Sequence, residues 1–121
     1  MPAPPPTLKK RRDFLACARA RRWAAPGLIL QARRRRDDEN IDGIRVGYTC
    51  SKKVGNAVAR NRAKRRLRAG AAEVVPVLGQ SGWDYVLIGR AGATAARPFP
   101  ALLDDIHQAL SQVHAPRKAK T

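Results

Sequence analysis

Hydrophobic residues recur with two different spacings along the chain, and each spacing predicts one kind of element. Between residues 10 and 22, apolar side chains three or four positions apart favour a helix, which Pro26 and Gly27 would end. Residues 28–32 form a short apolar run, and residues 44–50 alternate between apolar and polar, as the two faces of a strand do. The first half therefore predicts a helix followed by two strands.

The second half of the chain repeats this change of spacing with clearer boundaries. Asn56 is a good N-cap, and a long helix is expected from residue 57 to residue 75, where Pro76 would stop it. Residues 83–90 combine β-branched and aromatic side chains between glycines and predict a strand, and residues 99–113 predict a last helix. This order predicts a small single α+β domain, with a sheet of about three to four strands packed by three helices.

The remaining segments are expected to lie outside the packed domain. Residues 1–7 are Pro-rich and predict a mobile lead-in, residues 115–121 predict a basic mobile tail, and the domain itself is expected over residues 8–114. Between the first two strands, four arginines at residues 33–36 precede the acidic residues 37–39, which predicts a solvated hairpin loop. We assign this arginine run no function from the sequence.

Composition changes the picture through charge. The 121 residues include 25 Lys and Arg against 9 Asp and Glu, a formal net charge of +16. Such an excess attracts polyanions, above all nucleic acids, because cations placed on phosphates release condensed counterions. The chain has no apolar run long enough to span a membrane and no secretory signal pattern at its start, so we expect no membrane partner and a cytoplasmic location.

The charge is concentrated in the predicted helix at residues 57–75 and the segment before it. Residues 51–68 contain eight cationic side chains and no acidic one. Projection at about 100° per residue places small and apolar side chains on one stripe, which would face the sheet. The members of this stripe are Ala59, Ala63, Leu67, Gly70 and Val74.

The cations of this helix flank that stripe on both sides. Neighbouring cations one turn apart repel each other, and no glutamates are interleaved to relieve the repulsion. Phosphates would offset it, and arginine suits bidentate phosphate contacts. Asn61 lies within the polar arc, where its amide could read a base edge or a sugar hydroxyl. The alternatives are a generic solubilising face and, for Asn61, an ordinary surface amide.

The segment SKKVGNAVARNRAKRRLR, at residues 51–68, resembles the signature of the bacterial ribonuclease P protein component. That family has an Arg-Asn-Arg core, matched here by Arg60, Asn61 and Arg62, in a helix that follows a Lys-Lys-x-Gly-x-Ala segment. LKKRRDF at residues 8–14 and DYVLIGR at residues 84–90 resemble further parts of the family. The resemblance spans residues 8–113 in the same order.

The resemblance implies a protein subunit, itself without catalytic residues, of an RNA-based endoribonuclease that removes the 5′ leader from precursor tRNA. The cleavage chemistry would belong to the partner RNA, which would hold most of the Mg²⁺, and no small-molecule cofactor is expected. The resemblance also implies a left-handed crossover between the strands at residues 44–50 and 83–90. The residues that it places against the catalytic RNA are Lys52, Lys53, Arg60, Asn61, Arg62, Lys64, Arg65, Arg66 and Arg68.

The family also implies a cleft between the first helix and the sheet that holds the single-stranded leader of precursor tRNA. Phe14 is carried over to this cleft, where its ring would stack on a base; the alternative is an ordinary core phenylalanine. A second family aromatic falls here on Ala18, and the following strand offers no aromatic side chain. We therefore expect weaker stacking, with charge contributed instead by Arg19, Arg22 or Arg45.

The sequence offers no protein-borne catalytic or metal site. Cys17 and Cys50 are expected to be reduced, partly buried thiols, and His107 and His114 lack the neighbours that a zinc site needs. Asp104 and Asp105 are expected on the solvated face of the last helix. The main alternative is a structural RNA-binding protein of ribosomal type. A DNA-binding protein would need a helix-turn-helix spacing or a zinc pattern, and a protein-only nuclease would need a metal-binding acidic cluster. The sequence shows none of these.

Overall fold

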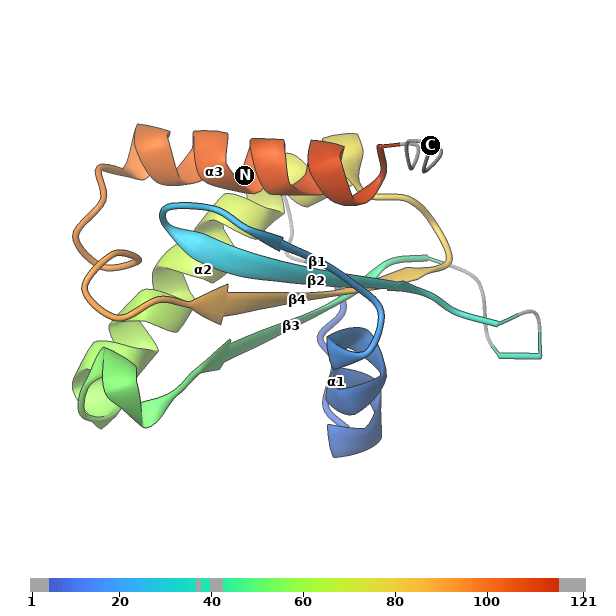
Figure 1. The fold of residues 1–121 in the computed structure, drawn as a ribbon, viewed down its shortest axis with the longest axis horizontal. Coiled ribbons are helices and arrows are strands. Elements are labelled where there is room, and N and C mark those ends of the chain that lie inside the picture. Colours follow the sequence, from blue (N-terminus) through green and yellow to red (C-terminus); the bar gives the residue numbers. More distant parts are fainter. Residues whose placement is uncertain (1–4, 37, 40–42, 116–121) are drawn as a thin grey trace, which may run out of the picture.

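The computed structural model describes residues 5–36, 38–39 and 43–115, which form a four-stranded sheet and three α helices (Figure 1). The elements are α1 (Arg11–Ala18), β1 (Arg21–Ala24), β2 (Leu28–Arg34), β3 (Arg45–Cys50), the 3-10 helix η1 (Lys52–Val54), α2 (Ala57–Leu78), β4 (Trp83–Gly89) and α3 (Phe99–Val113). The predicted α+β class is confirmed. No helix within the described ranges is long and apolar enough to cross a membrane.

The strands are ordered β1-β2-β4-β3, so the last strand of the chain lies inside the sheet. β4 pairs antiparallel with β2 and parallel with β3, and α2 connects the parallel pair. The left-handed form of this crossover remains a prediction of the family resemblance. The predicted connection between β2 and β3 is wrong as a hairpin, because β4 separates these two strands and takes the hydrogen bonds of both.

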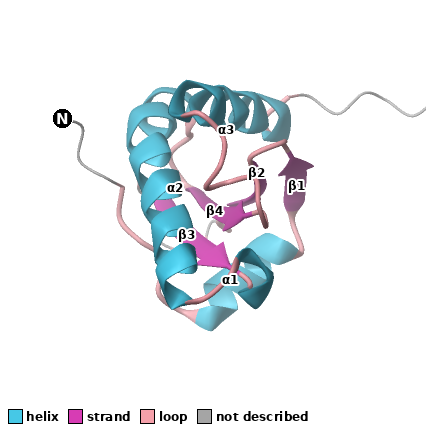
Figure 2. Cartoon of the chain, turned by 90° about the vertical axis from the view of Figure 1, so that its left-hand side faces the viewer, coloured by secondary structure: helices cyan, strands magenta, loops and turns pink. Residues whose placement is uncertain are grey.

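The helices cover the two faces of the sheet unequally. α2 and α3 pack on one face and α1 on the other, as Figures 1 and 2 show from two directions. The larger core lies under α2 and α3 and includes Leu67, Tyr85, Leu87 and Ile106. The smaller core under α1 joins Leu8, Cys17 and Val86, with Phe14 and Ile88 packed against them. β4 is therefore buried on both faces, which explains its unbroken apolar pattern.

The first predicted helix is too long at its C-terminal end. α1 stops at Ala18, and Arg22, expected on the helix, lies on strand β1. Residues 21–24 pair in register with residues 32–29 of β2, so hydrogen bonding to a neighbouring strand overrides the helix propensity of Ala and Arg.

The basic helix differs from expectation mainly at its C-terminal end. Asn56 caps α2 as predicted, because its side chain accepts a 2.9 Å hydrogen bond from the backbone N–H of Ala59. Pro76 does not end the helix, which continues to Leu78. The exposed proline removes one backbone donor, while Val74 and Val75 beside it are buried in the core and hold the last turn in place.

The segment before α1 bonds to the sheet. Val46 on the edge strand β3 donates to the Pro6 carbonyl and accepts from the Leu8 N–H, both at 2.9 Å. This bridge at Thr7 continues the sheet beyond β3. The mobility expected of residues 1–7 stays a prediction. Residues 1–4 and 116–121, which complete the two predicted termini, lie outside the described residues.

Candidate RNA-binding surfaces

The basic face of α2 is the first candidate surface. Helix geometry turns Ala63, Leu67 and Gly70 toward the sheet and α3, where they are buried. The polar side chains between them point outward. We define the basic face of α2 as Lys52, Lys53, Arg60, Asn61, Arg62, Lys64, Arg65 and Arg68, which are exposed or half-buried.

Gly70 explains how α2 approaches α3 closely. A Cβ at this position would overlap the Ile106 side chain of α3. The helix is thus seated by small residues on its inner side, and its cations are presented on a fixed frame. No ion pair with an acidic residue neutralises the basic face among the residues that the structure describes. Such a row of unpaired cations is an electrostatic site for a phosphate backbone.

Arg66 has a different role from its neighbours on α2. Its guanidinium donates to the carbonyl of Thr94 at 3.1 Å and to the carbonyl of Arg97, and it lies 5.9 Å from the Phe99 ring centroid. These contacts tie α2 to the loop before α3. We therefore infer that Arg66 stabilises the fold. The RNA contact that the resemblance implies for it stays a prediction.

A groove between α1 and the sheet is the second candidate surface. It encloses about 500 Å³. Its floor is apolar, with Val86 and Ile88 from β4, and Phe14 and Leu15 from α1 form a wall. Leu15 is 44% exposed and adds apolar surface to this wall. The complete lining is Lys9, Arg11, Phe14, Leu15, Ala18, Gln31, Tyr48, Thr49, Val86 and Ile88.

Gly47 sets the position of Phe14 in this groove. A Cβ at residue 47 would lie 2.6 Å from the Phe14 ring, so only glycine lets the ring rest on the sheet. Phe14 is half-buried there, packed against the smaller core while it lines the groove. Both readings of Phe14 from the sequence, core residue and cleft residue, therefore describe the same side chain.

The three arginines expected beside Phe14 are not among the residues that line the groove. Arg19 caps the C-terminus of α1 and is exposed. Arg22 lies opposite Gln31 in the register of β1 and β2, next to the groove but outside its lining. The groove obtains its cations instead from Lys9 and Arg11. Strand alternation from a known register would have identified Gln31 and Thr49, which the sequence analysis missed.

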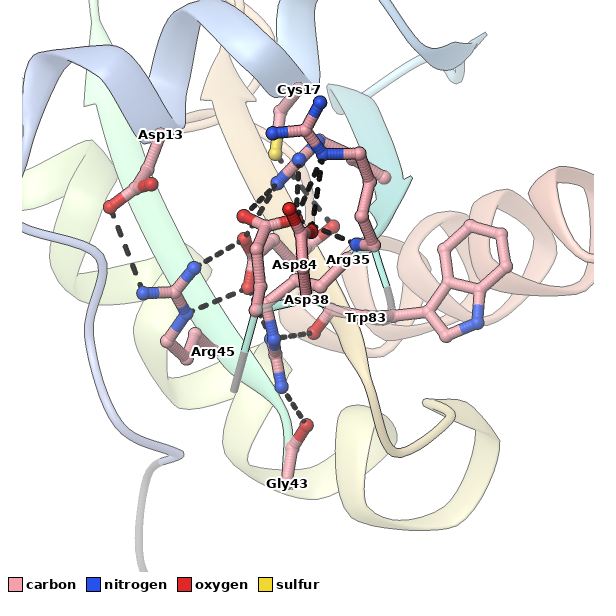
Figure 3. A network of polar contacts seen from close by, with 11 residues as sticks. Asp13, Cys17, Arg35, Asp38, Gly43, Arg45, Trp83 and Asp84 are labelled. Atoms are coloured by element: carbon pink, nitrogen blue, oxygen red, sulfur yellow. Dashed lines mark hydrogen bonds and ion pairs between the residues drawn. The ribbon is translucent and has the colours of Figure 1, made fainter. Parts of the chain in front are cut away.

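Arg45 belongs to a separate network around Asp84 (Figure 3). Asp84 is fully buried in the middle of the sheet, on β4. It accepts from Arg45 through Nε at 2.8 Å and Nη2 at 2.7 Å, and from Arg35 at 2.5 Å. Asp13 of α1 lies 3.7 Å from Arg45. The hydrogen bonds to Asp84 raise the pKa of Arg45 further above its ordinary value.

The two cysteines and His114 lie outside both candidate surfaces. Cys17 and Cys50 are free thiols, and burial raises the pKa of Cys17 to about 12. His114 Nε2 lies 2.6 Å from the Tyr85 hydroxyl and packs edge-on against Trp83. Within the described part of the chain, no three His, Cys, Asp or Glu side chains are grouped as metal ligands.

One acidic residue expected at the surface is buried. Asp105, predicted on the solvated face of the last helix, is 5% exposed and forms an ion pair with Arg97 at 2.6 Å. Only Asp104 of this pair is exposed. The ion pair offsets the desolvation of the Asp105 carboxylate under the loop before α3.

Comparison with known proteins places these surfaces in a family. The model of the Ribonuclease P family matches residues 4–114. The ribonuclease P protein component of Ruegeria pomeroyi is 63% identical over 110 residues, which cover 91% of this chain and 87% of the relative. That of Paramagnetospirillum magneticum is 55% identical over 113 residues, or 92% of this chain and 84% of the relative.

Solved structures agree with the sequence matches. The ribonuclease P protein of Staphylococcus aureus superposes with a TM-score of 0.71 at 25% identity, covering 89% of this chain and 94% of the other. The protein from Thermotoga maritima has the same fold, with a TM-score of 0.73 at 22% identity, covering 90% and 98%. These matches decide against a ribosomal protein, and the chain belongs to the ribonuclease P protein family.

Proposed function

We propose that this protein docks on ribonuclease P RNA through the basic face of α2 and holds the 5′ leader of precursor tRNA in the groove beside α1. The observation that carries the proposal is that two surfaces of different chemical character lie on opposite sides of one sheet. The basic face is rich in unpaired cations, whereas the groove combines apolar and aromatic side chains with a cationic rim.

The basic face suits a folded RNA partner. Arginines that project from a helix seated against the sheet and α3 reach successive phosphates without a change in the backbone, so the conformational entropy lost on binding is that of the side chains alone. Asn61 is exposed between Arg60 and Arg62 and offers an amide donor and an acceptor to a base or ribose. The family match implies ribonuclease P RNA as a partner of the chain, which supports the proposal that this RNA binds the basic face.

The groove suits an unpaired strand. Phe14 offers a ring on which a base can stack, and Val86 and Ile88 offer an apolar floor. Gln31 and Thr49 lie on the same sheet face and supply hydrogen-bonding groups for base edges. Double-stranded RNA presents no free base faces, which favours the single-stranded leader over the body of the tRNA.

The protein would position RNA rather than cleave it. We propose that the phosphodiester is hydrolysed in the RNA and that the RNA holds most of the Mg²⁺. The described residues do not form a ligand cluster that fits such an ion, so we assign no step to a protein-held metal. Bacterial ribonuclease P acts on newly made precursor tRNA, and we propose the cytoplasm as the site of this activity.

Reconstitution tests the proposal directly. The protein is added to bacterial ribonuclease P RNA at a magnesium concentration at which the RNA alone is slow, and removal of the leader from precursor tRNA is measured. We expect faster cleavage and tighter binding of precursor tRNA than of mature tRNA. Unstimulated cleavage would refute the docking role, and equal affinity for the two tRNAs would refute the groove assignment.

A further inference from the structure

A second pocket lies on the other side of α1 from the groove. It encloses about 720 Å³ and is lined by seven cationic and two acidic side chains. Helix α1 contributes Arg12, Asp13 and Ala16 to it, whereas it contributes Arg11, Phe14, Leu15 and Ala18 to the groove. At about 100° per residue these two sets lie on opposite sides of the helix. We call it the basic pocket: Thr7, Lys9, Lys10, Arg12, Asp13, Ala16, Arg33, Arg35, Arg36, Glu39 and Arg45.

The inner wall of the basic pocket is organised around Asp84. Arg35 and Arg45 bond to this buried carboxylate (Figure 3). Arg33 lies 3.9 Å from it. Arg35 also donates to the carbonyls of Trp83 at 3.1 Å and Gly43 at 2.7 Å. These guanidinium groups are therefore fixed before any ligand arrives. Besides Asp84, two further carboxylates pair with them, because Glu39 accepts from Arg33 at 2.8 Å and Asp13 lies 3.7 Å from Arg45.

The outer rim adds charge that the protein leaves unbalanced. Lys9, Lys10 and Arg12 are exposed and form no ion pair with any residue that the structure describes. The exposed Arg36 guanidinium lies at the longer distances of 3.6 Å from Asp38 and 3.8 Å from Glu39. Repulsion among so many cations opposes folding of the free protein, and an anion in the pocket would relieve it.

We propose that the basic pocket binds phosphate groups of an RNA backbone and forms a third RNA contact, separate from the basic face of α2 and from the groove. Lysine and arginine suit phosphate, and the four exposed cations of the rim outnumber the two acidic side chains of the lining, so the pocket carries the charge that a phosphate needs. Lys9 lines both the pocket and the groove, so an RNA strand in the groove reaches the pocket by crossing the chain at Lys9. The same chemistry would accept a phosphate of ribonuclease P RNA.

The arginine run at residues 33–36 supplies a matched test. Arg36→Ala and Arg12→Ala each remove an exposed cation of the pocket, and Arg34→Ala removes an exposed arginine that lines neither the pocket nor the groove. Affinity is measured over a range of salt concentrations for ribonuclease P RNA, and for precursor tRNA with a long leader or one just long enough for the groove. Circular dichroism verifies the fold of each variant.

We expect both pocket variants to weaken binding and to reduce the slope of log K against log salt by about 0.7 to 0.9, while Arg34→Ala does not. A loss of affinity seen only with the long leader identifies the leader as the ligand, and a loss with ribonuclease P RNA identifies that RNA; either supports the pocket. Pocket variants indistinguishable from Arg34→Ala with every RNA would overturn it. Phe14→Ala and Arg62→Ala in the same assays report separately on the proposed function.

Discussion

The guanidinium of Arg68 lies over the ring of Tyr48, with its central carbon 5.1 Å from the ring centroid. The pair joins the two proposed RNA-binding surfaces, because Arg68 belongs to the basic face of α2 and Tyr48 lies on β3 at the border of the groove. Tyr48 is 8% exposed, and burial raises its pKa to about 12. Its hydroxyl has no hydrogen-bond partner within the described structure.

The buried hydroxyl of Tyr48 predicts opposite effects for two substitutions. Tyr48→Phe keeps the ring under Arg68 and removes an unsatisfied polar group, so the free energy of unfolding should be unchanged or higher by about 1 kcal/mol. Tyr48→Ala leaves a cavity and should lower it by about 3 to 5 kcal/mol. Urea denaturation measures both; a Tyr48→Phe variant much less stable than the wild type would mean that the hydroxyl is bonded.

Arg62 and Arg66, one turn apart on α2, should respond differently to substitution. Arg60→Ala or Arg62→Ala should reduce the salt slope of binding to ribonuclease P RNA by about 0.9 for each phosphate that is no longer neutralised, with little change in stability. Arg66→Ala should leave the slope unchanged and lower the unfolding free energy by about 1.5 to 3 kcal/mol, because two carbonyl groups lose a charged donor. A reduced slope for Arg66→Ala would return this residue to the RNA surface.

Ala18 stands where the family often has a second aromatic residue, so an aromatic side chain can be introduced there by substitution. Ala18 is exposed and lines the groove, so Ala18→Phe should add a second stacking platform. We expect affinity for precursor tRNA to rise about fivefold or more, since base stacking on an aromatic contributes about 1 to 3 kcal/mol. Mature tRNA should show no gain, and neither should Ala20→Phe, which lies outside the groove. An equal gain for both tRNAs would mean nonspecific adhesion.

Asp84 should be among the acidic residues most important for stability. Asp84→Asn removes the charge that holds Arg35 and Arg45 in the sheet, and truncating one partner of a buried ion pair costs about 3 to 5 kcal/mol. The exposed Asp104→Asn is the matched control and should be near neutral. Thermal unfolding compares the two, and similar melting temperatures would show that the arginines do not depend on this carboxylate.

His114 makes stability depend on pH. Burial, with a smaller contribution from Arg21, lowers the pKa of His114 below 6.5, so the unfolded chain takes up the proton first. Its contribution is therefore complete above about pH 6.5 and is lost as the pH falls below that value. His114→Phe should flatten the decline in stability between about pH 7 and 5 in urea titrations. Exposed His107→Gln should leave the decline as it is.

The sequence predicted the elements whose pattern is local. The strand starting at Trp83 and the helix Phe99–Val113 were predicted to within one residue, because each has a strong period and clear boundaries. β1 was missed, since residues 21–24 are ordered by pairing with β2 rather than by their own preference. The spacing around Arg60 was enough to predict the basic face.

The contacts that the sequence analysis missed share one physical origin. Arg45 and Arg66, predicted to contact RNA, bond to Asp84 and to the Thr94 carbonyl, which are 39 and 28 positions away in sequence. Asp105 was placed in solvent, although Arg97 of the preceding loop covers it. Such pairings depend on strand register and loop path, which no local pattern encodes. The basic pocket was not predicted for the same reason, because its wall forms only when the fold brings Asp84 next to three arginines.

The central position of β4 constrains how the protein folds during its synthesis on the ribosome. β2 and β3 are made first, yet they remain unjoined until residues 83–89 have been synthesised and inserted between them. Both walls beside α1 depend on this late strand, through Val86 in one case and Asp84 in the other. A nascent chain that ends before β4 displays its cationic helix without a completed sheet beneath it. Competence to hold an RNA strand beside α1 should therefore arise in a single late step.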